Sequence, residues 1–163
     1  WCIEHADELG GIPPARQRLP AGLRPERKVT AAELETLYRA GFELARGFLD
    51  SEVARRAASA ISVEHELSFL LDAGVMGVAV GAEGGQRTVG LPDLIRGQID
   101  LMAEFEDEVL VVDFKSDRVL DPSHYLVQMA VYHEAARVLT GKRVRVELVS
   151  LRSGTSVPIL FDT

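Results

Sequence analysis

Hydrophobic side chains recur every three or four residues in one part of the chain and every second residue in others. Over residues 30–48 the helical spacing predicts an amphipathic helix, and Thr30 stands at its start in a capping-box pattern. A second, short helix is expected to run to about Ala60, with Asp50 or Ser51 as its cap. Residues 30 to about 60 are therefore expected to be helical.

Alternating apolar and polar residues predict strands at 62–71, 143–150 and about 156–161, with a further β-prone run at 75–80 and a glycine-rich loop at 81–90. Four side chains of the first strand are expected to share one face: Val63, His65, Leu67 and Phe69. Residues 94–105 and 109–114 predict a hairpin with an acidic turn.

A last helix is expected to begin at Asp121 and Pro122, a cap followed by a first-turn proline, and to end near Leu139 before Gly141. The expected order along the chain is thus two helices, a strand, a β hairpin, a helix and two strands. This order predicts an α/β fold in which a small mixed central β-sheet is flanked by helices.

Composition narrows the class of protein. Apolar residues make up 47% of the chain and charged residues 26%, which is ordinary for a globular domain. The absence of a long apolar run argues against a membrane association, and the single cysteine, Cys2, suits a reducing cytoplasmic compartment. The net charge of −7 disfavours a simple DNA-binding module, but it allows an enzyme that meets DNA at a small metal-filled cleft.

Two aspartates and a lysine carry the candidate chemistry. Asp113 and Lys115 are expected on one face of the second hairpin strand, with Phe114 on the other. A hairpin closing near residue 107 places Asp100 opposite position 114, and a one-residue slip or bulge places it opposite Asp113. Either way the carboxylates are neighbours, and a divalent cation would relieve their repulsion. The residues therefore indicate metal-assisted phosphodiester hydrolysis.

Four stretches occur in an order and spacing that resemble the PD-(D/E)XK nuclease superfamily, and more narrowly the RecB and AddA helicase-nucleases. The stretches are HELSF (65–69), GQID (97–100), VVDFKSD (111–117) and QMAVY (128–132). The resemblance covers roughly residues 30–150 and implies a restriction-endonuclease-like core. It also implies one nuclease domain over 1–163, with a helix end and linker at 1–29 and the core at 30–163, cut from a longer chain that begins before Trp1.

The resemblance also implies roles for individual residues. Glu66, Asp100, Asp113 and Lys115 match the catalytic positions. The Asp100 and Asp113 carboxylates and the Phe114 carbonyl match ligands of Mg²⁺, for which Mn²⁺ would substitute.

The remaining implied roles concern a metal-ligating histidine and the contact with DNA. Gln128 and Tyr132 match a helix motif that lines the site and helps to place DNA. The family has a metal-ligating histidine on an N-terminal helix. His5 is the candidate for it, although its flanks lack the expected glycine, so the true ligand could also precede Trp1.

The expected function is that of a Mg²⁺-dependent DNA exonuclease that works with a helicase, either in the same chain or in a partner subunit, during double-strand-break repair and recombination. One alternative is a catalytically inactive scaffold that holds DNA or a partner, which would have no reason to keep Asp100, Asp113 and Lys115 together. The other is a stand-alone endonuclease with the same core.

Overall fold

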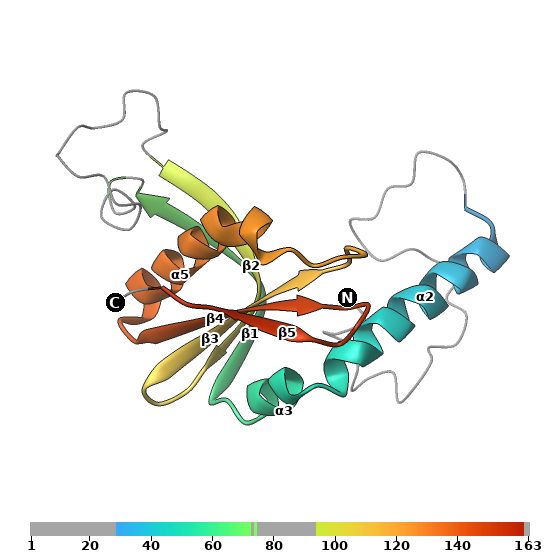
Figure 1. Cartoon of the computed structure of the whole chain (residues 1–163), viewed down its shortest axis with the longest axis horizontal. Helices are drawn as coiled ribbons and strands as arrows, with labels where there is room; N and C mark the ends of the chain where they lie inside the picture. Colours follow the sequence, from blue (N-terminus) through green and yellow to red (C-terminus); the bar gives the residue numbers. More distant parts are fainter. Residues whose placement is uncertain (1–28, 73, 75–93, 162–163) are drawn as a thin grey trace.

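The computed structural model describes residues 29–72, 74 and 94–161, and Figure 1 shows their arrangement. Several expectations fall outside these residues. They are the helix end at 1–9, the basic loop at 12–28, the β-prone run at 75–80, the loop at 81–90 and His5.

A five-stranded mixed sheet forms the centre of the fold. Its strands are β1 (Ser62–Asp72), β2 (Leu94–Glu104), β3 (Glu108–Lys115), β4 (Arg143–Ser150) and β5 (Ser156–Ile159). They lie in sequence order across the sheet, and all neighbours are antiparallel except the parallel pair β3 and β4. The expected α/β architecture with a small mixed central sheet is confirmed.

Helices cover both faces of this sheet (Figure 1). The parallel strands β3 and β4 are joined by the short 3₁₀ helix η1 (Pro122–Tyr125) and the helix α5 (Leu126–Thr140), which lies on one face. The helices α2 (Ala31–Leu49) and α3 (Glu52–Ala58) precede the sheet and lie toward its other face. Parallel neighbours need such a crossover, because a short turn cannot return the chain to the same end of the sheet.

The ends of the helices follow the local sequence signals. The Thr30 side chain accepts from the backbone N–H of Glu33 in a complete capping box, and Gly141 ends α5 in the left-handed conformation. Of the two candidate caps for α3, Ser51 is the one that caps. Asp121 caps η1, so α5 itself begins at Leu126, four residues after the expected first helical residue Pro122.

Each face of the sheet has its own hydrophobic core. The core under α5, called here the α5 core, contains among others Phe69, Ile99, Val111, Met129 and Tyr132. The core under α2 and α3, called here the α3 core, contains among others Phe48, Val53, Leu101, Leu110 and Val112. These two layers hold the central strands β2 and β3 between them, and β3 is therefore almost entirely buried.

The alternation of β1 and β2 is broken at one point. Leu67 pairs with Ile99 of the α5 core, but His65 pairs with Leu101 of the α3 core. The break lies at Glu66, which has a φ of 53° and is the only non-glycine residue with positive φ in the described part of the chain. The expectation that His65 shares a face with Leu67 is wrong, because the left-handed backbone at Glu66 reverses the faces.

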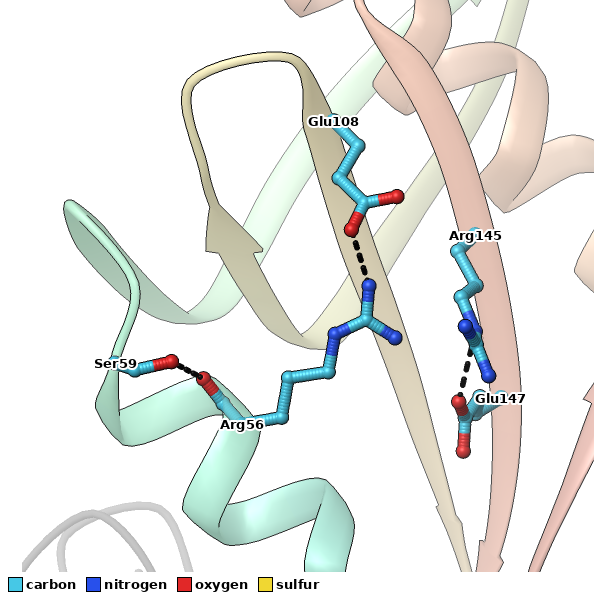
Figure 2. A network of polar contacts seen from close by, with 5 residues as sticks. All are labelled: Arg56, Ser59, Glu108, Arg145 and Glu147. Atoms are coloured by element: carbon cyan, nitrogen blue, oxygen red, sulfur yellow. Dashed lines mark hydrogen bonds and ion pairs between the residues drawn. The ribbon is translucent and has the colours of Figure 1, made fainter.

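Figure 2 shows charged side chains on α3 and on the strands β3 and β4. Arg56 of α3 reaches across to Glu108 at the start of β3 and forms an ion pair. On β4, Arg145 Nε lies 3.1 Å from Oε1 of Glu147, a carboxylate that is otherwise buried. These pairs neutralise carboxylates that would otherwise be partly desolvated without a partner.

The turn after β4 fixes the segment that follows Lys115. The backbone N–H of Leu151 donates to the Lys115 carbonyl at 2.9 Å, and the Arg152 guanidinium donates to the Ser116 carbonyl. The same turn touches α2, since a Cβ at Gly47 would lie 3.1 Å from the Leu151 carbonyl oxygen. The end of β3 is thus held from the α2 side through this turn.

Candidate active site

Asp113 and Lys115 lie at the end of β3 on the side of the sheet that faces α5. Both residues share a face of the strand with Val111, which belongs to the α5 core, because the three lie at every second position of β3. Lys115 Nζ lies 2.6 Å from Asp113 Oδ2. Phe114 points to the opposite face, where its ring meets Phe48 edge-on at 4.7 Å. Strand alternation therefore places the carboxylate and the ammonium together, as the sequence predicts.

Asp100 reaches the same place from β2. Leu101 pairs with Val112, so the register continued by one residue sets Asp100 opposite Asp113. The regular ladder stops there, and the backbone N–H of Phe114 donates to the Asp100 carboxylate oxygen Oδ2 at 2.8 Å instead. Of the two registers that the sequence left open, the one that brings the two aspartates together is the one formed.

Burial raises the pKa of both aspartates. Burial is the main cause at Asp113, whose pKa is raised to about 6 although the Lys115 ammonium opposes the shift, and the Asp100 charge raises it further. At Asp100 burial again raises the pKa, while the Phe114 N–H and the Lys115 charge oppose the shift. Two neighbouring carboxylates with raised pKa values mark a place where added positive charge would be strongly favourable.

Gln128 and Tyr132, one turn apart on α5, meet Lys115 through a chain of hydrogen bonds. Lys115 Nζ donates to Gln128 Oε1 at 3.0 Å, and Gln128 Nε2 donates to the Tyr132 hydroxyl at 2.9 Å. The amide of Gln128 is therefore oriented from both ends. Burial is the largest cause of the raised pKa of Tyr132, and the Gln128 hydrogen bond opposes that shift.

Tyr132 is held in turn by an aromatic ring on β1. Phe69 lies edge-on to Tyr132 with ring centroids 5.8 Å apart. The Phe69 ring also lies over Gly97, its partner on β2, where an added Cβ would fall 2.3 Å from the ring atom Cζ. The glycine of the GQID stretch thus makes room for the ring that supports Tyr132.

Glu66 lies at the break in the alternation of β1 and makes fewer contacts than Asp100, Asp113 and Lys115 do. It lies between His65, which pairs with Leu101, and Leu67, which pairs with Ile99. Its side chain is exposed, and its charge contributes to the raised pKa of Tyr132. Its backbone carbonyl accepts from Gln98 Nε2 at 3.1 Å. The left-handed conformation of Glu66 is the kind of backbone strain that clusters at functional sites.

The arrangement suits a hard divalent cation. The Oδ2 atom of Asp113 is buried and, despite its ion pair with Lys115, has no hydrogen bond of suitable geometry among the described residues. Within those residues no three His, Cys, Asp or Glu side chains gather as a metal site. A cation would therefore rely on the Asp100 and Asp113 carboxylates, the Phe114 carbonyl, water and a substrate phosphate, which is the ligand set that Mg²⁺ accepts.

Two acidic residues beside a lysine on a mixed sheet are chemically suited to metal-assisted hydrolysis. The family profile described as "PD-(D/E)XK nuclease superfamily" matches residues 2–157. The chain belongs to this superfamily.

The relatives are large helicase-linked proteins. The chain is 27% identical over 128 residues to an ATP-dependent helicase/nuclease subunit of Bacillus anthracis, and the match covers 71% of this chain and 10% of that protein. It is 29% identical over 101 residues to the protein of the same name from Bacillus thuringiensis (strain Al Hakam), covering 54% and 8%. The chain thus spans about a tenth of the length of these relatives.

Among solved structures, the chain is similar to a protein assigned as an exonuclease from Eubacterium rectale. That match has 14% identity and a TM-score of 0.39, and it covers 79% of this chain and 54% of the other. No helix in the described residues is long and apolar enough to cross a membrane.

Two residues at this site were not assigned a role from the sequence. Tyr125 lies with its ring against the Lys115 ammonium, and its hydroxyl donates to Asp117. Their spacing in the sequence could have placed them at the site, because Tyr125 is three residues from Gln128 and Asp117 is two residues from Lys115. A tyrosine at helical spacing is, however, more often a packing residue.

Proposed function

We propose that this chain is the Mg²⁺-dependent DNA exonuclease domain of a longer cytoplasmic helicase-nuclease that acts in double-strand-break repair and recombination. The observation that carries the proposal is the convergence of Asp100, Asp113 and Lys115, in which the Asp113 carboxylate is buried. The names of the curated relatives support the link to a helicase. Because the net charge of this chain is −7, the rest of such a protein would supply positive surface for DNA.

In this proposal each side chain has a distinct task. Asp100, Asp113 and the Phe114 carbonyl would hold Mg²⁺, with Mn²⁺ as a substitute, and the ion would supply Lewis-acid activation of water and of the phosphodiester. Lys115 orients the attacking water and stabilises the charge that develops on the phosphate oxygens. Glu66 belongs to the same set, His5 is the candidate further ligand of the metal, and the DNA is placed by Gln128 and Tyr132.

The test is cleavage of end-labelled linear DNA and of closed circular DNA by the full-length protein, with Mg²⁺ and with EDTA. Linear DNA should be degraded in Mg²⁺, circular DNA should be spared, and EDTA should stop the reaction. The Lys115→Met variant should lose at least about 100-fold in kcat, because a charge-stabilising group is removed from the transition state. Lys142→Met is the matched control, since its ammonium pairs with Glu104 away from the site.

Each alternative gives a different result. Cutting of closed circular DNA would identify an endonuclease. DNA binding without any cleavage would identify a scaffold. Wild-type cleavage by Lys115→Met would remove the lysine from the mechanism and with it the basis of the proposal. Calorimetric titration with Mn²⁺ tests the metal site without activity, because Asp113→Asn should abolish the binding seen with the wild type.

A further inference from the structure

The Lys115 ammonium is held from three sides. Asp113 Oδ2 lies 2.6 Å from Nζ, Gln128 Oε1 lies 3.0 Å away, and the centroid of the Tyr125 ring lies 4.3 Å away. Only 15% of the lysine side chain is exposed. A lysine has four rotatable bonds, and fixing it costs about 2 kcal/mol of rotamer entropy, so a defined position needs several contacts.

Tyr125 is itself fixed at its far end. Its hydroxyl donates to Asp117 Oδ2 at 2.9 Å, and its backbone closes η1, which starts at the capping residue Asp121. The hydrogen bond to Asp117 is the largest cause of the raised pKa of the Tyr125 hydroxyl, which therefore stays protonated and remains a donor. The ring is thus anchored between its backbone and Asp117, with one face toward the lysine.

We propose that Tyr125, held by Asp117, is a positioning residue that fixes the Lys115 ammonium beside the Asp113 carboxylate. A tyrosine face attracts an ammonium, and the attraction is stronger where water is partly excluded. Gln128 and the Tyr125 ring contact the ammonium in addition to Asp113, so its place does not depend on the carboxylate alone. Asp117 and Tyr125 act through Lys115 and touch no reacting atom. The catalytic part of this inference rests on the proposed nuclease function, while the geometric part does not.

Four variants separate the ring from its anchor. Tyr125→Leu removes the ring, whereas Tyr125→Phe keeps the ring and removes the hydrogen bond. Asp117→Ala removes the acceptor, and Asp117→Asn keeps an acceptor oxygen without the charge. Val127→Ala is the matched control on α5, because Val127 is 78% exposed.

In the full-length protein, kcat for DNA cleavage at saturating Mg²⁺ should fall about 5- to 30-fold in Tyr125→Leu, the range that a partly desolvated cation–π contact supports. The KM for DNA should change less than about twofold, since the residue acts on a group engaged in the chemical step. Tyr125→Phe and Asp117→Ala break the same hydrogen bond and keep the ring, so each should lose a similar part of the rate, smaller than the loss in Tyr125→Leu. Asp117→Asn keeps an acceptor oxygen and should recover most of what Asp117→Ala loses. An unchanged kcat in Tyr125→Leu would overturn the inference.

A second measurement does not depend on activity. The chain has three lysines, Lys28, Lys115 and Lys142, so selective labelling gives a simple lysine NMR spectrum. The ε-methylene protons of Lys115 should resonate upfield because of the Tyr125 ring current, and the shift should be lost in Tyr125→Leu and retained in Tyr125→Phe. Its absence from the wild type would overturn the inference. Wild-type protein that shows the shift but cuts no DNA would instead refute the proposed function and leave the geometry supported.

Discussion

Replacing Asp113 by asparagine is expected to stabilise the metal-free protein while it abolishes the metal site. Asp113 is 2% exposed, and its pKa is raised from 3.8 to about 6, mainly by burial. At about 1.4 kcal/mol for each pKa unit, the ionised carboxylate costs the folded state about 3 kcal/mol. Asparagine has nearly the shape of the protonated acid and no charge, so the variant avoids this cost.

The sign follows from proton binding. The folded protein holds the Asp113 proton more tightly than the unfolded chain, so this group favours folding below its unfolded pKa, and the benefit is lost as the pH rises through about 6. Linkage then predicts that the free energy of unfolding of Asp113→Asn exceeds that of the wild type by about 1 kcal/mol at about pH 4.5 and by about 3 kcal/mol at about pH 8.

The assay is urea unfolding in EDTA at both pH values, followed by circular dichroism. Asp107→Asn is the control, because Asp107 lies exposed in the turn between β2 and β3 and should change stability by less than about 0.5 kcal/mol. Mg²⁺ at about 100 times its dissociation constant should stabilise the wild type by about 2.7 kcal/mol and leave Asp113→Asn unchanged. An asparagine variant that is less stable than wild type at the higher pH, or an advantage independent of pH, would refute this reasoning.

Two glycine substitutions test the packing around the site by urea unfolding. Gly97→Ala should destabilise the protein by about 1–3 kcal/mol, because its Cβ would lie 2.3 Å from Phe69 Cζ, and adding Phe69→Leu should recover part of that loss. Simple additivity of the two changes would show that the ring is not the obstacle. Gly154→Ala should cost more than Gly141→Ala. Both have φ near 68°, a strain of about 1–2 kcal/mol for alanine, but only the Gly154 Cβ meets backbone, 3.0 Å from the Gly47 oxygen. Equal losses would contradict that close approach.

The sequence predicts the helices, the strands and the order of the motifs because those signals are local. The capping box at Thr30, the glycine stop at Gly141 and the strand at 143–150 were each predicted from neighbours in the chain, and each is confirmed. Alternation also gave the shared face of Asp113 and Lys115, the main part of the candidate site. The family assignment from four short stretches is confirmed as well.

The register of the hairpin could not be predicted, because β2 and β3 have apolar side chains on both faces, so a shift of one residue would still bury them. The packing of both faces of β2 and β3 sets Leu101 opposite Val112, which brings Asp100 to Asp113. The reversal of faces at Glu66 could not be predicted from the sequence either, because a glutamate does not indicate a left-handed backbone. Both features depend on cross-strand contacts between residues far apart in sequence.

What the sequence determined by itself is which residues are available and which way each strand presents them. Tertiary structure decided the rest: that α5 lies over the end of β3, that Gln128 and the Tyr125 ring meet the Lys115 ammonium, and that Asp113 is buried beside it. The physical reason is that strand alternation and helix caps are set by the local backbone. Burial, pKa and contacts between elements arise only when separate layers close over one another.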